Sequence, residues 1–270
     1  MDWIQGEKFK MLGDFTYSPA KKRKDDYDNL PNTFSLDVLF DGCFVYTHTI
    51  YAKELFIELK KSSKGVTVIT HNGDINIDDT FLIPDNVLYW YSQNVNTKNP
   101  KLEAIPIGLE NDRWFKGLKK KEKMLGKLSE RKKCRNLVYM NHNINTNPSK
   151  RFTPYYILEN KKWVTSERGV NGENFDNYLN NIYNHTFVIC PEGNGIDTHR
   201  VWETLYMKSF PIMKRNINHT CFFSDFPICF VDDWEQVTED FLNDQLTLMN
   251  ILSHNIHMLD FSWWKNYILE

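Results

Sequence analysis

A glycine-containing loop between two apolar segments is the part of this sequence whose residue types best suit chemistry. The stretch FVICPEGNGIDTHRVWETLYM runs from Phe187 to Met207. Its first residues are typical of a buried strand, and a helical pattern begins after the loop EGNGIDT. A strand–loop–helix junction of this kind points free backbone N–H groups and the positive end of the helix dipole outward. The sequence therefore predicts an anion site at this loop.

The side chains around the loop suit a nucleoside diphosphate. Gly193 and Gly195 are expected to adopt positive φ and to let a ligand approach the backbone closely. Arg200 offers a planar, permanently charged guanidinium to two linked phosphates. Glu203, one turn later, is an acceptor-only carboxylate that suits the two hydroxyls of a ribose. His199 is a further candidate for contact with a phosphate or a sugar. The alternative interpretation is an Arg–Glu pair on a helix surface.

Two better-known nucleotide loops do not fit this segment. A GxGxxG dinucleotide loop needs a third glycine where this chain has Thr198, and an acidic residue about 20 positions later, where it has Met213 and Lys214. The sequence also lacks a GxxxxGK[ST] loop. A nicotinamide enzyme and a P-loop enzyme are therefore disfavoured.

A second polar segment is expected at the same end of a sheet. NHNINTNPSKR, from Asn141 to Arg151, follows a predicted strand and precedes a predicted helix. Lys150 and Arg151 are the charges that would form a second wall of the anion site. A plain Asn/Pro turn with solvated basic residues is the alternative.

Candidates for a general base lie in the first half of the chain, where two predicted strands end in polar residues. VYTH ends in His48, and THNGD contains His71 and Asp74. We predict Asp74 as the base, because burial can tune the pKa of a carboxylate. His71 and His48 are the alternatives, unless they are structural histidines that only make hydrogen bonds.

Composition and charge favour a globular, soluble protein. Hydrophobic residues make up 41% of the chain and charged residues 25%, and the net charge of −2 favours neither nucleic acid nor an anionic membrane. The five cysteines are odd in number and form no CxxC pair, as expected for reduced thiols. The N-terminal residues lack the apolar run of a signal peptide, and no segment approaches the roughly 18 apolar residues of a membrane span. We expect a cytoplasmic protein.

Apolar runs alternate with longer amphipathic segments along the chain, which predicts an α/β fold with mainly parallel strands. The expected domains are 1–115 and 136–270, with a lysine-rich linker at 116–135. We interpret this linker as a solvated connecting helix, since runs of charge are usually exposed. The aromatic C-terminal segment SWWKNYILE is expected to pack back on the body of the protein.

Metal motifs are weak in this sequence. Asp26 and Asp28 form a DxD pattern, but they follow AKKRKD rather than an apolar strand. Spacings that resemble calcium loops or zinc helices each lack a required residue. We therefore expect no essential metal and no cofactor.

Two stretches resemble the exostosin-like glycosyltransferases, in particular their short soluble forms from large viruses and microbes. They are PEGNGIDTHRVWETLYMKSFPIM, residues 191–213, and VLYWYSQNVNTKNPKLEAIPIGLEN, residues 87–111. The resemblance implies a GT-B fold, in which two Rossmann-like domains face each other across a cleft. It implies that the C-terminal domain binds a nucleotide sugar and that the N-terminal domain binds most of the acceptor, without an essential metal.

The resemblance also assigns roles within the loop. Gly193, Asn194 and Gly195 would line the diphosphate, Arg200 would pair with it, and Glu203 would hold the ribose. The expected function is transfer of a sugar, with inversion, from a UDP-sugar or a related donor to a hydroxyl of a glycan acceptor. Two alternatives remain open: a non-catalytic module that binds nucleotides or glycans, and a DNA-base glycosyltransferase.

Overall fold

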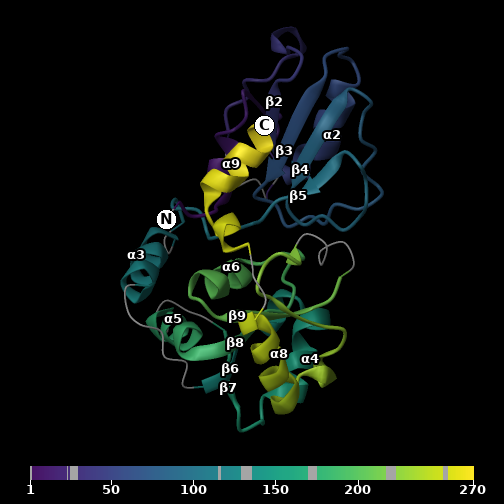
Figure 1. Ribbon diagram of the computed structural model, residues 1–270. Helices are drawn as coiled ribbons and strands as arrows, with labels where there is room; N and C mark the ends of the chain where they lie inside the picture. The colour runs from purple at the N-terminus through teal and green to yellow at the C-terminus, as the bar shows by residue number, and fades with distance from the viewer. Residues whose placement is uncertain are drawn as a thin grey trace. The chain divides into compact units, whose positions relative to one another are not determined.

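The computed structural model describes residues 2–22, 24, 30–114, 117–128, 136–169, 175–216, 223–251 and 255–270. These residues form two compact units, and each unit is built on a five-stranded parallel sheet (Figure 1). The first unit comprises Met1–Gly108, Gly195–Asp197 and Asp260–Glu270, and the second comprises Leu109–Asn194 and Thr198–Leu259. The predicted α/β class with parallel strands is confirmed.

The sheet of the first unit follows the order of the chain, β1-β2-β3-β4-β5. Its strands are β1 (Phe15–Tyr17), β2 (Phe44–His48), β3 (Val66–His71), β4 (Val87–Ser92) and β5 (Leu102–Ala104). Its helices are α1 (Gly6–Lys10), η1 (Leu36–Val38), η2 (Thr49–Tyr51), α2 (Ala52–Leu59) and α9 (Phe261–Leu269).

Both faces of this first sheet are covered, because successive side chains of a strand point to opposite faces. Trp90 of β4 faces α2, where its ring centroid lies 4.9 Å from that of Phe56. His71 of β3 faces the other side and stacks on Phe9 of α1 at 5.1 Å, and Phe9 contacts Phe261 of α9 edge to face, also at 5.1 Å. Figure 1 shows α2 and α9 on different sides of the strands.

The sheet of the second unit has the order β10-β9-β8-β6-β7. Its strands are β6 (Asn136–Asn141), β7 (Val164–Glu167), β8 (His185–Ile189), β9 (Phe210–Lys214) and β10 (Cys229–Val231). Its helices are α3 (Gly117–Leu128), η3 (Ile144–Thr146), α4 (Pro148–Leu158), α5 (Phe175–Asn184), α6 (His199–Tyr206), η4 (Trp234–Gln236), α8 (Glu239–Ile251) and η5 (Ile256–Leu259). From β6 the chain first adds β7 on one side and then β8 on the other, so the strand order reverses between β6 and β8.

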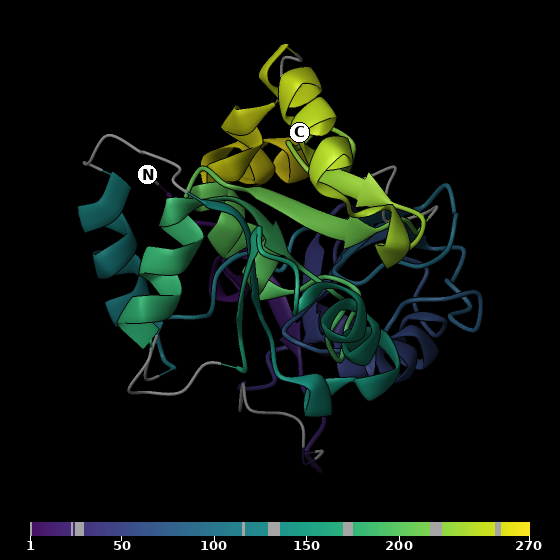
Figure 2. The same cartoon turned by 90° about the horizontal axis from the view of Figure 1, so that it is seen from below.

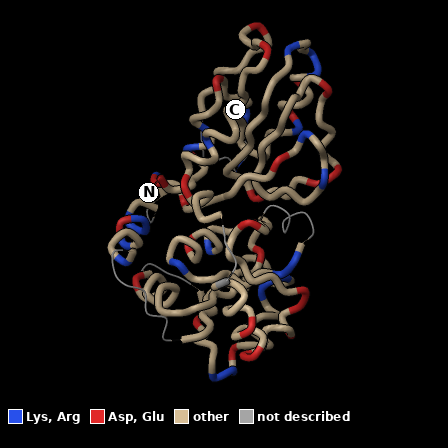
Figure 3. Tube along the Cα trace, viewed as in Figure 1, with Lys and Arg blue, Asp and Glu red and all other residues tan. Residues whose placement is uncertain are grey.

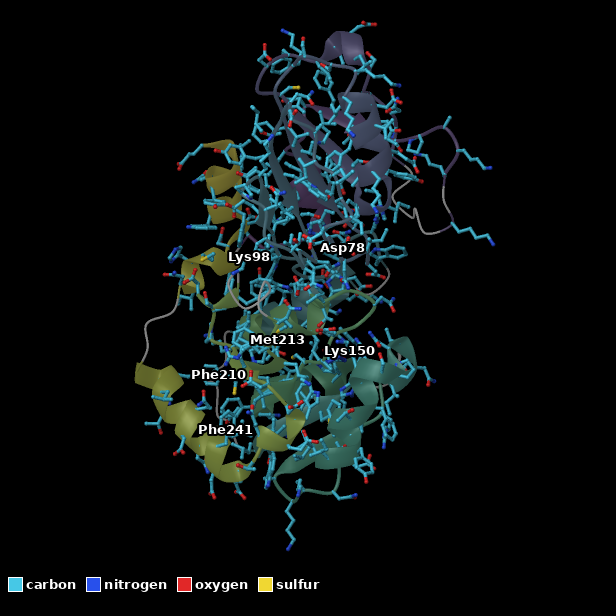
Figure 4. The ribbon with its side chains drawn as sticks, turned by 90° about the vertical axis from the view of Figure 1, so that its right-hand side faces the viewer. Asp78, Lys98, Lys150, Phe210, Met213 and Phe241 are labelled. Atoms are coloured by element: carbon cyan, nitrogen blue, oxygen red, sulfur yellow. The ribbon has the colours of Figure 1, made fainter. Side chains whose placement is uncertain are left out.

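Helices cover both faces of the second sheet, as in a doubly wound fold. Tyr155 and Leu158 of α4 and Leu242 of α8 pack in one core with the strands. Figure 1 shows α5 on one side of these strands and α4 with α8 on the other, and Figure 2 shows the same layers from below. Of the residues labelled in Figure 4, Phe210 of β9 and Phe241 of α8 both pack against this core.

The compact units differ from the domains predicted from the sequence. The boundary falls after Gly108 rather than at 115, and residues 260–270 belong to the first unit. The second difference has a packing cause, since Phe261 contacts Phe9 and Tyr267 of α9 lies 6.4 Å from Tyr91 of β4. The expectation that the aromatic C-terminal segment packs back on the body is confirmed.

The predicted solvated linker requires a correction. Residues 117–128 of the segment 116–135 form α3, and the remainder lies outside the described residues. Lys120 and Lys121 of this helix are 7% and 4% exposed. Both are buried because they pair with carboxylates of the second unit, Lys120 with Glu203 at 2.6 Å and Lys121 with Asp112 at 2.5 Å. The helix is therefore part of the second unit.

Lysine and arginine alternate with aspartate and glutamate along the trace of both units (Figure 3). None of the helices in the described ranges is both long and apolar enough to cross a membrane. Asp26 and Asp28, which form the DxD pattern, lie outside the described residues.

Candidate anion site

The two polar segments singled out from the sequence meet at the carboxyl edge of the second sheet. β6 and β8 are parallel neighbours, with Tyr139 opposite Val188. The loop after β6 leads to α4, and the glycine loop after β8 leads to α6. Open α/β sheets bind ligands outside the carboxyl ends of the strands, at the point where strand order reverses. In this unit that point lies between β6 and β8.

Arg151 of α4 joins the two loops. Its side chain donates from Nε to the carbonyl oxygen of Glu192 at 2.8 Å and from Nη1 to that of Asn143 at 3.1 Å. Carbonyl partners orient the guanidinium but carry no charge to compensate it. Burial, with the nearby charge of Arg200, lowers the pKa of Arg151 to about 10. Arg151 thus remains cationic at neutral pH in a place that favours an anion.

Arg200 supplies a second cation from the first turn of α6. Its guanidinium lies 5.5 Å from the ring centroid of Tyr178 on α5. The Nε atom is buried and has no hydrogen-bond partner within the described residues. Two arginines therefore share this edge of the sheet. Arg151 contacts carbonyl oxygens, whereas Arg200 contacts an aromatic ring and interacts electrostatically with Glu203.

Four buried side-chain atoms in the described part of the chain have no hydrogen-bond partner, and all four come from this edge. They are Asn141 Oδ1, His142 Nδ1, Thr198 Oγ1 and Arg200 Nε. An unsatisfied buried polar group costs about 1–3 kcal/mol, and native proteins keep few of them. Their concentration at the carboxyl ends of β6 and β8 indicates a ligand site.

We expected positive φ at the loop glycines, but neither Gly193 nor Gly195 has it. A Cβ atom at Gly193 would lie 2.9 Å from Arg151 Nη2, and one at Gly195 would lie 2.5 Å from Asn94 Nδ2. Both positions are therefore glycine because a side chain packs against them.

The loop is also divided between the two units. Gly193 lies beside Arg151 in the second unit, and Asn194 is exposed. Gly195 and Asp197 belong to the first unit, where the backbone N–H of Asp197 donates to Asn94 Oδ1 at 2.9 Å. Of residues 193–195, which were predicted to line a diphosphate, Gly193 is the one that lies beside an arginine.

Glu203 lies inside the second unit and is bound by protein groups. It is 3% exposed, it pairs with Lys120 Nζ at 2.6 Å, and it accepts a hydrogen bond from the hydroxyl of Tyr178. Burial alone would raise the pKa of Glu203, but Lys120, Tyr178 and Arg200 lower it to about 2. The alternative of a surface Arg–Glu pair is wrong, because this carboxylate is buried and its cation partner is Lys120.

The two remaining candidates of the second unit are more exposed than Arg151. Lys150, labelled in Figure 4 at the start of α4, is exposed and pairs with Glu192 Oε2 at 3.2 Å. His199 is half-buried at the first position of α6. Lys150 and His199 each precede an arginine in the sequence. Arg151 is the residue whose contacts hold the two loops together.

The base candidates lie at the carboxyl ends of β2 and β3 in the first unit. Both ring nitrogens of His71 are engaged, since Nδ1 accepts from Asn72 N at 2.8 Å and Nε2 donates to Pro106 O at 3.0 Å. His48 Nδ1 accepts from Ile50 N at 3.3 Å. Asp74 is exposed rather than buried.

Sequence reasoning missed several residues of the site. Asn141 and His142 lie in the predicted polar segment 141–151 but are not named there as site residues, Tyr178 is not predicted, and Lys120 falls in the predicted linker. The Asn–His pair that ends an apolar strand was the one signal available. Within the described ranges, no group of three His, Cys, Asp or Glu side chains could hold a metal ion.

Comparison of the chain with protein-family models and with curated proteins gave no match.

Proposed function

We propose that this protein is a glycosyltransferase that moves a sugar from a nucleoside diphosphate donor, with UDP-sugars as the first candidates, to a hydroxyl of a glycan acceptor. The observation that carries the proposal is the cluster of two arginines and four buried, unpartnered polar atoms at the point where the strand order reverses. A diphosphate places negative charge beside Arg151, whose guanidinium donates to carbonyl oxygens, and beside Arg200, whose buried Nε has no hydrogen-bond partner in the described part of the chain. Its hydroxyl-bearing substituents supply further hydrogen bonds.

The two arginines then have a role in the chemical step. Transfer breaks the bond between the anomeric carbon and the diphosphate oxygen, and the electron pair stays on the diphosphate. Arg151 and Arg200 stabilise this developing charge in a largely buried site, where electrostatic interactions are strong. The acceptor hydroxyl forms the new bond to the anomeric carbon and loses its proton to a base. Attack from the face opposite the leaving group inverts the anomeric centre.

Asp74 is our candidate for the base in this proposal. Its side chain is exposed, so an acceptor can reach it, whereas His71 is buried and uses both ring nitrogens within the protein. The GT-B arrangement, the acceptor site on the first unit and the independence from metal belong to the same proposal. Support for it comes from the two parallel sheets and from the resemblance of residues 87–111 and 191–213 to exostosin-like enzymes.

Calorimetric titration with UDP and UDP-sugars, followed by an assay of UDP release, tests the proposal. Arg200→Ala should weaken UDP binding by about 10- to 100-fold, as expected for loss of a charged hydrogen-bond donor. Arg215→Ala is the matched control, because Arg215 is exposed and pairs with Asp232 at 3.1 Å. Equal affinity of the two variants for UDP would refute the assignment of the site. Binding without turnover on any acceptor would favour a binding module.

A further inference from the structure

The end of β6 presents two side chains that are fully buried yet only half satisfied. Asn141 and His142 are each 0% exposed. Each makes hydrogen bonds to the protein through one polar atom and leaves the other without a partner in the described part of the chain. The identity of these two atoms decides what kind of group would complete the site.

The free atom of Asn141 is an acceptor. Its Nδ2 donates to Tyr139 Oη at 2.8 Å and to Glu167 Oε2 at 3.0 Å. A carboxylate oxygen only accepts, so the amide nitrogen must face Glu167. The carbonyl oxygen Oδ1 is then the atom without a partner. The amide cannot flip to place its NH2 group there without breaking the hydrogen bond to Glu167.

The free atom of His142 is also an acceptor. Its Nε2 lies 2.9 Å from the carbonyl oxygen of Arg151, which only accepts, so Nε2 carries the proton and Nδ1 carries a lone pair. The ring of Tyr155, with its centroid 4.3 Å away, holds the imidazole in place. Burial and then the charge of Arg200 lower the pKa of His142 to about 3. Nδ1 therefore stays an acceptor at neutral pH.

Arg200 links the two acceptors. Among the charged groups that act on His142, Arg200 has the largest effect. Its guanidinium also lies over Tyr178, whose ring centroid is 6.2 Å from that of Tyr139, the partner of Asn141. Asn141 ends β6 and His142 follows it, and Arg200 lies in the first turn of the helix that follows β8, so all three lie at the same carboxyl edge of adjacent parallel strands. Further phosphate oxygens would be repelled there, because they are acceptors themselves.

We propose that Asn141 Oδ1 and His142 Nδ1 accept hydrogen bonds from hydroxyl or N–H groups of the ligand whose phosphates bind Arg200. These two residues would then make the site selective for a phosphate ester that carries hydroxyls over a bare polyphosphate. The inference rests on the proposed function, since it deepens the same site. It assigns specificity to residues that carry no charge.

Calorimetric titrations with UDP-glucose and with inorganic pyrophosphate test this assignment. Asn141→Ala and His142→Ala should each weaken binding of UDP-glucose by about 3- to 10-fold, as for loss of a neutral hydrogen bond. Pyrophosphate should bind these variants as tightly as the wild type, or more tightly. Asn181→Ala is the matched control, because Asn181 also donates to Glu167, at 3.1 Å, but has no unpartnered buried atom. The control should leave both affinities unchanged.

The outcomes separate this inference from the proposed function. If Asn141→Ala and His142→Ala weaken both ligands equally, or neither, while Arg200→Ala weakens both, the specificity role is wrong and the anion site stands. If the wild type binds neither ligand, both proposals fail. A second measurement is independent of variant folding: UDP-glucose analogues with each hydroxyl in turn replaced by hydrogen, and a uracil methylated at N3, are titrated into the wild type. At least one should lose affinity, and no loss from any of them overturns the inference.

Discussion

A neighbouring side chain packs closely against Gly193. A Cβ atom there would lie 2.9 Å from Arg151 Nη2 and 3.3 Å from Thr198 Cγ2. The carbonyl oxygen of Gly193 also accepts from Asn147 Nδ2 at 2.7 Å, so the loop has little freedom to retreat. An added methyl group must therefore displace the guanidinium, which is the flexible end of its side chain.

Gly193→Ala should consequently affect binding more than folding. We expect UDP to bind about 10-fold more weakly, because Arg151 loses its position, while the melting temperature changes little. Calorimetry and thermal unfolding measure the two effects. Gly126→Ala is the control, since a Cβ at Gly126 meets no atom within 4 Å. Wild-type affinity in Gly193→Ala would show that Arg151 does not contact the ligand.

His142 should make the stability of the protein depend on pH. Its folded pKa of about 3 lies below the ordinary value of 6.5. Between these two pH values the unfolded chain binds a proton that the folded chain does not, so stability falls as pH decreases from 6.5 toward 3. The slope of this contribution approaches about 1.4 kcal/mol per pH unit. Urea unfolding at several pH values should show a smaller slope for His142→Gln than for the wild type. An unchanged slope in His142→Gln would contradict the prediction.

Helix α3 is attached to the second unit through buried charges. Lys120 lies 2.6 Å from Glu203 Oε1 on α6 and 3.2 Å from Glu110 Oε2. Burial alone would lower the pKa of Lys120, but these two carboxylates raise it, so the lysine is charged. Removing one partner of a buried ion pair leaves the other charge uncompensated, which typically costs about 3–5 kcal/mol. The attachment of α3 therefore depends on both partners.

Lys120→Met should destabilise the second unit by about 3 kcal/mol. The control is Lys119→Met, since Lys119 is exposed; it should cost less than about 0.5 kcal/mol, the usual range for surface substitutions. The double variant Lys120→Met/Glu203→Gln should be more stable than the sum of the two single variants implies, because both members of the buried pair lose their charge together. Urea unfolding of the wild type, Lys120→Met, Glu203→Gln and the double variant gives the coupling free energy between the two groups. Additive costs would mean that the two groups do not interact.

Local patterns predicted most of the elements, and partners that are distant in the sequence account for the rest. The alternation of apolar runs with amphipathic segments predicts β2, β3, β6 and β8 and the helices α4 and α6. The ion pair that Lys120 forms inside the protein involves Glu203, 83 residues away, and no spacing rule predicts that pair. Likewise, the loop around Arg200 is visible in the sequence, but the free acceptors of Asn141 and His142 follow only from where Glu167 and the Arg151 carbonyl lie.

At the scale of the whole chain, the two sheets differ in their strand order. In the first unit the strand order follows the chain, so the sheet has no reversal point. In the second unit the order reverses between β6 and β8, where the unpartnered polar atoms lie. Residues 260–270 return to the first unit and contribute buried side chains to it, including Phe261 and Trp264. The site and the C-terminal helix are therefore in separate units.

Deletion of residues 260–270 should destabilise the first unit selectively. It removes Phe261, Trp264 and Ile268, which are 6%, 2% and 4% exposed, and uncovers Phe9 of α1. Burial of one such side chain stabilises a protein by about 1.5–3 kcal/mol, so the loss should be several kcal/mol. Hydrogen exchange should accelerate at the amides of β3 and β4 far more than at those of β6 and β8. Deletion of residues 269–270 is the control, since Leu269 is 47% exposed. Unchanged protection of β3 and β4 in the longer deletion would show that α9 does not stabilise the first unit, because its buried aromatic side chains would then contribute nothing to that core.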